Sequence, residues 1–329
     1  MGNSNGLMHL RPFGKLTYEP GAPAATADTV YDIASLTKVA ATTLVAMALV
    51  DAGRLDLGAP VGRHLPCFAS GDRDVVRVRD LLAHSSGLPA WAPLFREVRG
   101  KDALVQRVCG LELEYAPGSK SQYGDLAFIL LGAVLENVGE APLDVLAMRL
   151  VFEPLGMRDT VYRPGPEIVA RAAPTEEDAW RGRLLRGEVQ DSNAYVMGGV
   201  APHAGIFSTA GDLARLSEML LGGGIFRGRR VLRQETVESF TRRVDIPGST
   251  RMLGWETPAG DPWAGRRWSD RAYGHSGLTG TVMWIDPGRD LFLVLLTNRI
   301  HPRRENDSWR EVRRGVSDAV VDALASAPR

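Results

Sequence analysis

Ser35 and Lys38 place a hydroxyl and an amine three positions apart. In a helix, both side chains would lie on one face, one turn apart. A lysine that is desolvated enough to lose its proton can accept the hydroxyl proton, which would make Ser35 a nucleophile. This is the S-x-x-K pattern of acylating serine enzymes. The alternative is structural, because an N-capping serine and a lysine that extends to solvent produce the same spacing.

The residues after Lys38 favour the catalytic interpretation. From Val39 to Ala52 the chain is apolar around the circumference of a helix, and Gly53 suits a C-cap. A helix of this kind is buried, so Ser35 and Lys38 would lie in the first turn of a core helix. There the positive end of the helix dipole favours a developing oxyanion and a lowered pKa of Lys38.

Tyr123 and Asp125 form a second candidate motif, just before another nearly all-apolar segment that predicts a helix over 125–137. A tyrosine on a loop before a core helix can direct its hydroxyl into a cleft and accept or relay protons beside a lysine. The alternative is an interfacial tyrosine.

A third motif covers residues 273–280, in which glycines alternate with polar residues around His275 and Ser276. Gly277 and its neighbouring glycines let the backbone approach a ligand closely, as the strand of an oxyanion hole requires. The alternative is a β-bulge that carries a surface histidine.

Together these motifs resemble those of the class C β-lactamase-like serine hydrolases, a family that also contains penicillin-binding proteins, D-aminopeptidases and carboxylesterases. The resemblance covers nearly the whole chain. It includes the segments 35–38, 81–89, 154–160, 203–210 and 275–277. Several ordered motifs at family-like spacings are more specific than any single one.

The resemblance implies that Ser35 is the acylated nucleophile and that Lys38 and Tyr123 share the proton transfers. It implies an oxyanion hole made by the backbone N–H groups of Ser35 and Leu278. The residues that it implies for substrate binding are Asp125, His275, Ser276 and Gly277. Neither a cofactor nor a metal is implied, and His84, beside Ser85, is expected to be structural.

This chain departs from the family pattern at two places. Asp125 stands where the pattern has asparagine, so an amide donor to the substrate is lost and the ammonium form of Lys38 is favoured, which shifts the burden of base towards Tyr123. Relatives also have a helix and a strand before the segment that begins here near Leu10. We therefore expect a sheet edge that is covered by the first residues or shared with a second copy in a homo-oligomer.

Strands at both ends of the chain with helices between them predict an α/β (α+β type) fold. Its antiparallel sheet would come from the N- and C-terminal segments, flanked by helices, with an inserted mostly helical domain. We expect the sheet domain over 1–56 and 200–329, the helical domain over 57–199, and the active site in the cleft between them. Finer expectations are a strand near 7–19, a hairpin of 281–285 with 291–296, and a helix over 306–326. The residues of that helix expected to face inward are Val316, Ala319, Val320 and Leu324.

Composition excludes some function classes. The 329 residues contain 39 basic and 39 acidic side chains and no basic stripe, which disfavours nucleic acid or an anionic membrane as partner. No apolar run is expected to span a membrane. Cys67 and Cys109 are expected to be free core thiols. Without a signal peptide the chain as given is expected to be cytoplasmic, or periplasmic or secreted if it is truncated.

We therefore predict a serine hydrolase that acts through an acyl-enzyme on small carboxylic esters. His275 offers less positive charge than a lysine would to the carboxylate of a β-lactam or peptide, although arginines from nearby loops could compensate. The alternatives are a D,D-peptidase or weak β-lactamase, and a catalytically silent penicillin-binding-like protein that only binds ligands.

Overall fold

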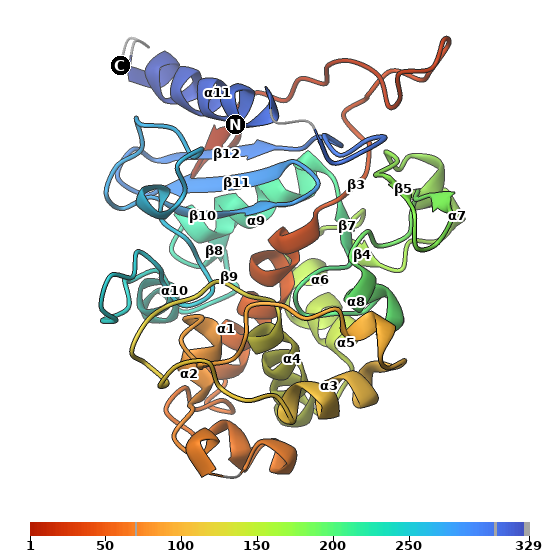
Figure 1. Ribbon diagram of the computed structural model, residues 1–329. Helices are drawn as coiled ribbons and strands as arrows, with labels where there is room; N and C mark the ends of the chain where they lie inside the picture. Colours follow the sequence, from red (N-terminus) through yellow and green to blue (C-terminus); the bar gives the residue numbers. More distant parts are fainter. Residues whose placement is uncertain (70, 306–307, 326–329) are drawn as a thin grey trace.

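One antiparallel sheet and a thick layer of helices organise the protein (Figure 1). The structure is a computed structural model that describes residues 1–69, 71–305 and 308–325. The main sheet has the order β10-β11-β12-β1-β2, and all of its pairings are antiparallel. Its strands are β1 (Gly2–Asn3), β2 (Gly6–Leu7), β10 (Tyr273–Gly277), β11 (Thr281–Asp286) and β12 (Leu291–Leu295). The predicted sheet of N- and C-terminal segments is therefore confirmed.

The two faces of this sheet carry different helices, and the alternation along β11 explains why. Met283 and Ile285 belong to the main core, which includes α9 (Ala210–Leu221), whereas Val282 and Trp284 pack in a second cluster with α11 (Ser308–Ala325). Successive residues of a strand point to opposite faces, so one fully buried strand can fill both layers. The sheet lies between α9 and α11 (Figure 1).

The helical segment 34–51 begins beside the sheet and runs into the helical layer. It consists of a 3-10 turn (Ala34–Leu36), a π turn (Lys38–Thr42) and α1 (Thr43–Asp51). By length and composition this segment could cross a membrane, with a mean hydropathy of 1.4. The expectation that no apolar run has membrane-spanning length was therefore wrong. However, 78% of the segment is buried within the protein, as in the core helix of a soluble fold.

Some of the remaining helices pack against α1. The nearly all-apolar α4 (Leu126–Gly139) packs against it, as expected for a helix that is apolar on most of its surface. The others are α2 (Val78–Leu82), α3 (Lys101–Cys109), α5 (Leu143–Ala147), α6 (Glu153–Leu155), α7 (Pro166–Ala170), α8 (Ser192–Val196) and α10 (Gln234–Phe240).

Three small sheets complete the fold. The first has the order β3-β7-β4 and consists of β3 (Tyr31–Asp32), β7 (Ile206–Ser208) and β4 (Val161–Tyr162). Its strands come from all three expected segments, 1–56, 57–199 and 200–329. The domain boundaries at 56/57 and 199/200 stay a prediction. The other two are hairpins, formed by β5 (Glu177–Asp178) with β6 (Arg183–Leu184) and by β8 (Ile225–Phe226) with β9 (Arg229–Arg230).

The strand predicted near 7–19 was wrong. Residues 8–29 are irregular apart from an isolated bridge between Lys15 and Ala24, because Pro12, Gly14 and Pro20 interrupt a strand ladder. The first seven residues instead form a hairpin, in which Gly2 pairs with Phe292 of β12. The edge of β12 is thus covered by the first residues, one of the two expected outcomes, and a homo-oligomer stays a prediction.

Helix α11 is present as predicted, but its buried face is rotated. The buried positions are Trp309, Arg313, Ser317 and Val321, whereas Ala319 is exposed and Val316 and Val320 are half-buried. The i, i+4 spacing of the buried set follows the contact with the sheet. Residues 306 and 326 and the side chain of Leu324 lie outside the described residues.

Cys67 and Cys109 form a disulfide, so the expectation of free thiols was wrong. The 3-10 turn Pro66–Phe68 packs against α3 and brings the two Cα atoms to 5.7 Å. The two residues are 42 positions apart, and their spacing carried no signal of this contact.

Candidate active site

Ser35, Lys38 and Tyr123 form a triangle of hydrogen bonds. The Lys38 ammonium donates to Ser35 Oγ at 3.1 Å and to the Tyr123 hydroxyl at 2.8 Å. The Tyr123 hydroxyl donates to Ser35 Oγ at 2.8 Å. The tyrosine comes from the loop before α4, so two segments 85 residues apart in sequence meet at one hydroxyl. This arrangement can remove a proton from Ser35 and return one to a leaving group.

The Lys38 side chain has 0% exposure, and its surroundings favour the charged form. Asp125 Oδ1 lies 2.7 Å from Nζ, and the His203 carbonyl oxygen accepts a further bond at 3.3 Å. Four acceptors thus surround an ammonium that has three N–H groups. Burial lowers the pKa of Lys38, but the Asp125 carboxylate and then Tyr123 outweigh burial and raise it. The expected lowering by the helix dipole was wrong, and the expected effect of Asp125 is present.

The turn that carries Ser35 is held by a buried carboxylate. Asp32 Oδ1 accepts the Ala34 N–H at 2.8 Å, and Oδ2 accepts the Gln190 N–H at 2.8 Å. Ala34 has a φ of +46°, in the left-handed region that non-glycine residues rarely adopt. Strain of this kind persists only where surrounding contacts determine the backbone, as Asp32 does here. Ser35 follows directly and is partly exposed.

The strand β10 approaches this turn from the other side. Thr279 and Thr281 donate side-chain hydrogen bonds to the Asp32 and Ile33 carbonyl oxygens, at 2.7 and 2.9 Å. Gly277 makes the close approach possible, because a Cβ there would lie 2.5 Å from the Ile33 oxygen. Among the described residues the Leu278 N–H has no backbone acceptor, so it is available to a ligand oxygen, as the predicted oxyanion hole requires.

Two neutral histidines border the triangle. The His275 ring centroid lies 5.5 Å from that of Tyr123, and Nδ1 contacts the Ser276 carbonyl oxygen at 2.8 Å. Burial, then the positive charges of Lys38 and Arg251, lower the pKa of His275 to about 3. At neutral pH His275 therefore carries no charge, as we expected.

His84 is buried behind Tyr123, in agreement with its expected structural role. Its Nδ1 accepts the Gly124 N–H at 3.3 Å, and its ring packs between Tyr123 and Phe128, with centroids 4.9 and 5.0 Å away. Burial is the main cause that lowers the pKa of His84 well below its usual value. The imidazole thus fixes the loop that carries Tyr123.

A cavity of about 370 Å³ lies over Ser35. The predicted site residues that line it are Ser35, Tyr123, His275, Ser276, Gly277 and Leu278. Lys38 and Asp125 lie beneath this lining and contact each other, so the predicted substrate contact of Asp125 stays a prediction.

Charged side chains that the sequence motifs did not include form the rest of the cavity wall. These are Arg251, Arg299, Arg310, Arg313, Glu256 and Asp261. Arg251 forms an ion pair with Glu256, and Arg313 forms one with Asp261. The described wall of the cavity is therefore rich in arginine. These residues lie far from the motifs in sequence, and only the fold brings them to the cavity.

Behind Lys38 lies a further group that sequence reasoning missed. Metal-ligating atoms of Asp125, Asp191 and His203 all lie within 4.8 Å of one another. A cation there would compete with the Lys38 ammonium, which already contacts Asp125, so we assign no metal to this group. Two signals were available: His203 begins the segment 203–210 of the family resemblance, and Asp191 precedes a short helix, where aspartate is a favoured N-cap.

Comparison with known proteins finds relatives over most of the chain. A family model described as Beta-lactamase matches residues 9–317. Proteins named "Putative D-alanyl-D-alanine carboxypeptidase" from Salmonella typhi and Salmonella newport (strain SL254) are each 35% identical over 308 residues, covering 84% of this chain and 71% of theirs.

Solved structures share the fold at lower identity. A penicillin-binding protein homologue from Caulobacter crescentus has a TM-score of 0.74 at 22% identity, covering 94% of this chain and 87% of the other. A mutant of simvastatin synthase (LovD) from Aspergillus terreus has a TM-score of 0.76 at 22% identity, covering 99% and 92%.

Proposed function

Because the chain belongs to the Beta-lactamase family of serine hydrolases, we propose that it forms an acyl-enzyme on Ser35 and hydrolyses small carboxylic esters. The observation that carries the proposal is the hydrogen-bonded triangle of Ser35, Lys38 and Tyr123. A protein that only binds ligands would not need all three side chains in contact.

In the proposed reaction Lys38 and Tyr123 act as a unit. In the reactive form this pair has lost one proton. Lys38 remains an ammonium beside Asp125, and the Tyr123 oxygen accepts the Ser35 proton. Ser35 Oγ then bonds to the ester carbonyl carbon, and the N–H groups of Ser35 and Leu278 stabilise the oxyanion. The ester C–O bond breaks as Tyr123 returns the proton to the alcohol. Water repeats these steps on the acyl-enzyme, frees the acid and restores Ser35.

The preference for esters rests on the chemistry of the leaving group and on Asp125. The oxygen of an ester can leave as an alkoxide, whereas the nitrogen of an amide must be protonated before it leaves, so an ester asks less of the proton donor. Ionised Asp125 only accepts hydrogen bonds, and it engages Lys38. Neutral His275 adds no charge for a substrate carboxylate.

Hydrolysis of a D-alanyl peptide is the second candidate, and the cavity wall favours it. Arginines line the cavity around Ser35, and a guanidinium is a favoured partner of a substrate carboxylate, which weakens the electrostatic argument for simple esters. The relatives that are 35% identical carry the name of a D-alanyl-D-alanine carboxypeptidase. A weak β-lactamase activity would draw on the same charges.

One parallel assay separates these candidates. The purified chain is incubated with a short-chain aryl ester, a D-alanyl-D-alanine peptide and a chromogenic cephalosporin, and intact mass detects any trapped acyl group. We expect the highest kcat/KM on the ester. A higher value on the peptide would establish the second candidate. Absence of turnover and of any covalent adduct with all three would support the catalytically silent alternative.

A further inference from the structure

A second hydrogen-bonded pair, formed by His203 and Asp191, lies directly behind the pair formed by Lys38 and Asp125. His203 Nε2 lies 3.0 Å from Asp191 Oδ1, and the His203 side chain is 1% exposed. The imidazole and the carboxylates of Asp191 and Asp125 all come within 4.8 Å of one another. His203 thus stands beside two carboxylates that would otherwise repel each other at close range.

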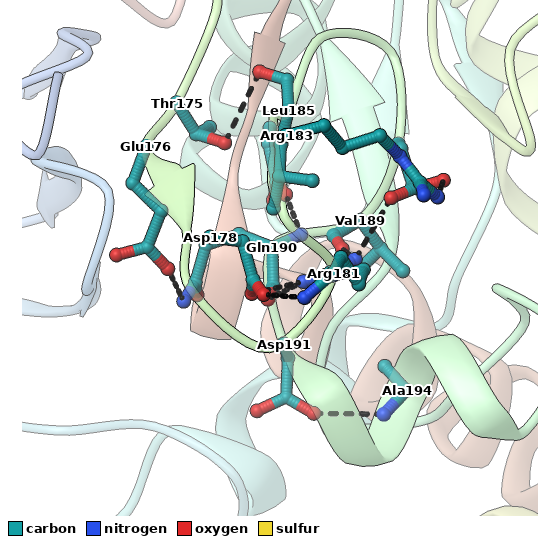
Figure 2. A network of polar contacts seen from close by, with 12 residues as sticks. Thr175, Glu176, Asp178, Arg181, Arg183, Leu185, Val189, Gln190, Asp191 and Ala194 are labelled. Carbon is teal, nitrogen blue, oxygen red and sulfur yellow. Dashed lines mark hydrogen bonds and ion pairs between the residues drawn. The ribbon is translucent and has the colours of Figure 1, made fainter. Parts of the chain in front are cut away.

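Asp191 is fixed by the elements around it. Its Oδ1 accepts the Ala194 N–H at 2.7 Å and caps α8, as Figure 2 shows. The residue before it, Gln190, is held on both sides: its N–H donates to Asp32, and its carbonyl oxygen accepts from Arg181 at 2.6 Å. The Arg181 side chain is 3% exposed and also contacts Asp178 (Figure 2).

The segment after α8 is attached to the nucleophile helix at three places. The Pro202 carbonyl oxygen accepts from Thr42 Oγ1 at 2.7 Å, and the Ile206 N–H donates to Thr37 Oγ1 at 3.2 Å. Between them, the His203 carbonyl oxygen accepts from Lys38. The bond between the His203 ring and Asp191 anchors the peptide that contacts the ammonium.

We propose that His203 and Asp191 are a positioning pair that holds Lys38 and Asp125 in the geometry needed to activate Ser35. The proposal rests on the proposed function, since it assigns a supporting role within that site. His203 acts through two groups: its carbonyl oxygen fixes the ammonium of Lys38, and its ring contacts Asp191 beside Asp125. Groups from several elements face this cluster, namely Lys38 and Asp32 beside the nucleophile turn, Asp125 before α4, and Arg181 from the hairpin of β5 and β6.

The test compares His203→Ala, His203→Gln and a matched control, Asn193→Ala. Asn193 is also 1% exposed and lies on α8, but its side chain contacts Phe95 and Ala92, away from Lys38. For each variant the rate of Ser35 labelling by a fluorophosphonate is measured from pH 5 to 10, with kcat and KM on an aryl ester and the melting temperature.

We expect His203→Ala to lower kcat and the labelling rate by about 10- to 100-fold, the size expected for small misplacement of a reacting group, with little change in KM. His203→Gln keeps an N–H donor towards Asp191 and should recover most of the rate. Asn193→Ala should lower the melting temperature and leave the rate and pH profile of the folded protein unchanged. If His203→Ala does not fold, Asp191→Asn, which keeps a capping oxygen, should show the same loss in kcat.

The inference is overturned if His203→Ala is labelled at the wild-type rate, or if Asn193→Ala loses as much activity per folded molecule as His203→Ala. Failure of the wild-type protein to be labelled on Ser35 would instead overturn the proposed function. Labelling of the wild-type protein at Ser35 therefore separates the two failures.

Discussion

The Tyr123 hydroxyl donates a 2.8 Å hydrogen bond to Ser35 Oγ and accepts one of the same length from Lys38. The Lys38 ammonium therefore contacts Ser35 Oγ in two ways, directly and through the Tyr123 hydroxyl. The raised pKa of Lys38 makes this contact central, because a lysine that keeps its proton cannot be the base on its own.

Lys38→Met and Tyr123→Phe should therefore be non-additive. Each single substitution should lower kcat by about 10²- to 10⁴-fold, the usual contribution of general acid–base catalysis. The double variant should be little worse than either single variant, because both remove one shared proton relay. Steady-state kinetics on an aryl ester provides the check, and losses that multiply in the double variant would refute a shared relay.

Asp125→Asn tests the electrostatic control of Lys38. The Asp125 carboxylate raises the pKa of Lys38, so its removal should lower that pKa and move the acid limb of the kcat/KM profile towards lower pH. The new amide donor should raise the ratio of peptide or β-lactam activity to ester activity by about 2- to 10-fold. Parallel pH–rate profiles on an ester and a peptide measure both effects. An equal loss of activity on every substrate, with an unchanged pH–rate profile, would show that Asp125 is only structural.

Gly277→Ala should separate β10 from the nucleophile turn. The added Cβ would lie 2.2 Å from Thr281 Oγ1 and 2.5 Å from the Ile33 oxygen, so we expect a loss of about 1–3 kcal/mol of unfolding free energy and a lower kcat. Gly315→Ala is the matched control, since no atom lies within 4 Å of its added Cβ and alanine favours the helix. Urea unfolding and ester kinetics are the measurements. Equal effects of the two substitutions would argue against the close approach.

Asp32 should make stability depend on pH in an identifiable window. Burial raises its pKa from 3.8 to about 6, so between these values the folded protein binds more protons than the unfolded chain. The contribution of Asp32 to the free energy of unfolding is fully present below pH 3.8 and is lost as the pH rises through about 6. The loss amounts to about 3 kcal/mol. Asp32→Asn removes this component. The free energy of unfolding in urea is measured between pH 4 and 7 for the wild-type protein and Asp32→Asn. The same dependence on pH in both proteins would contradict the assignment.

Sequence was most informative where the signal is local and periodic. The S-x-x-K spacing and the apolar run after Lys38 predicted the central helix, and the two apolar runs that flank a turn predicted β11 and β12, two of the five strands of the main sheet. Apolar residues around the whole circumference of a helix can be recognised in the sequence and indicate burial, so the position of Ser35 and Lys38 at the start of a core helix followed from them.

Contacts between distant segments were not predictable in the same way. The bond between His203 and Asp191, the arginines around Ser35 and the disulfide of Cys67 with Cys109 depend on how loops pack. The buried face of α11 was misplaced because apolar and polar residues alternate there, and the sheet determines which of them is covered. The expected strand near 7–19 does not form because Pro12 and Gly14 interrupt its apolar residues.

The most direct test of the central claim is the intact mass of the wild-type protein and of Ser35→Ala after incubation with a fluorophosphonate. We predict one adduct on the wild-type protein, located at Ser35 by peptide mapping. We predict no adduct and no ester turnover for Ser35→Ala at an unchanged melting temperature. An adduct that persists in the folded Ser35→Ala variant, or that maps to a different serine, would contradict the assignment of Ser35 as the nucleophile.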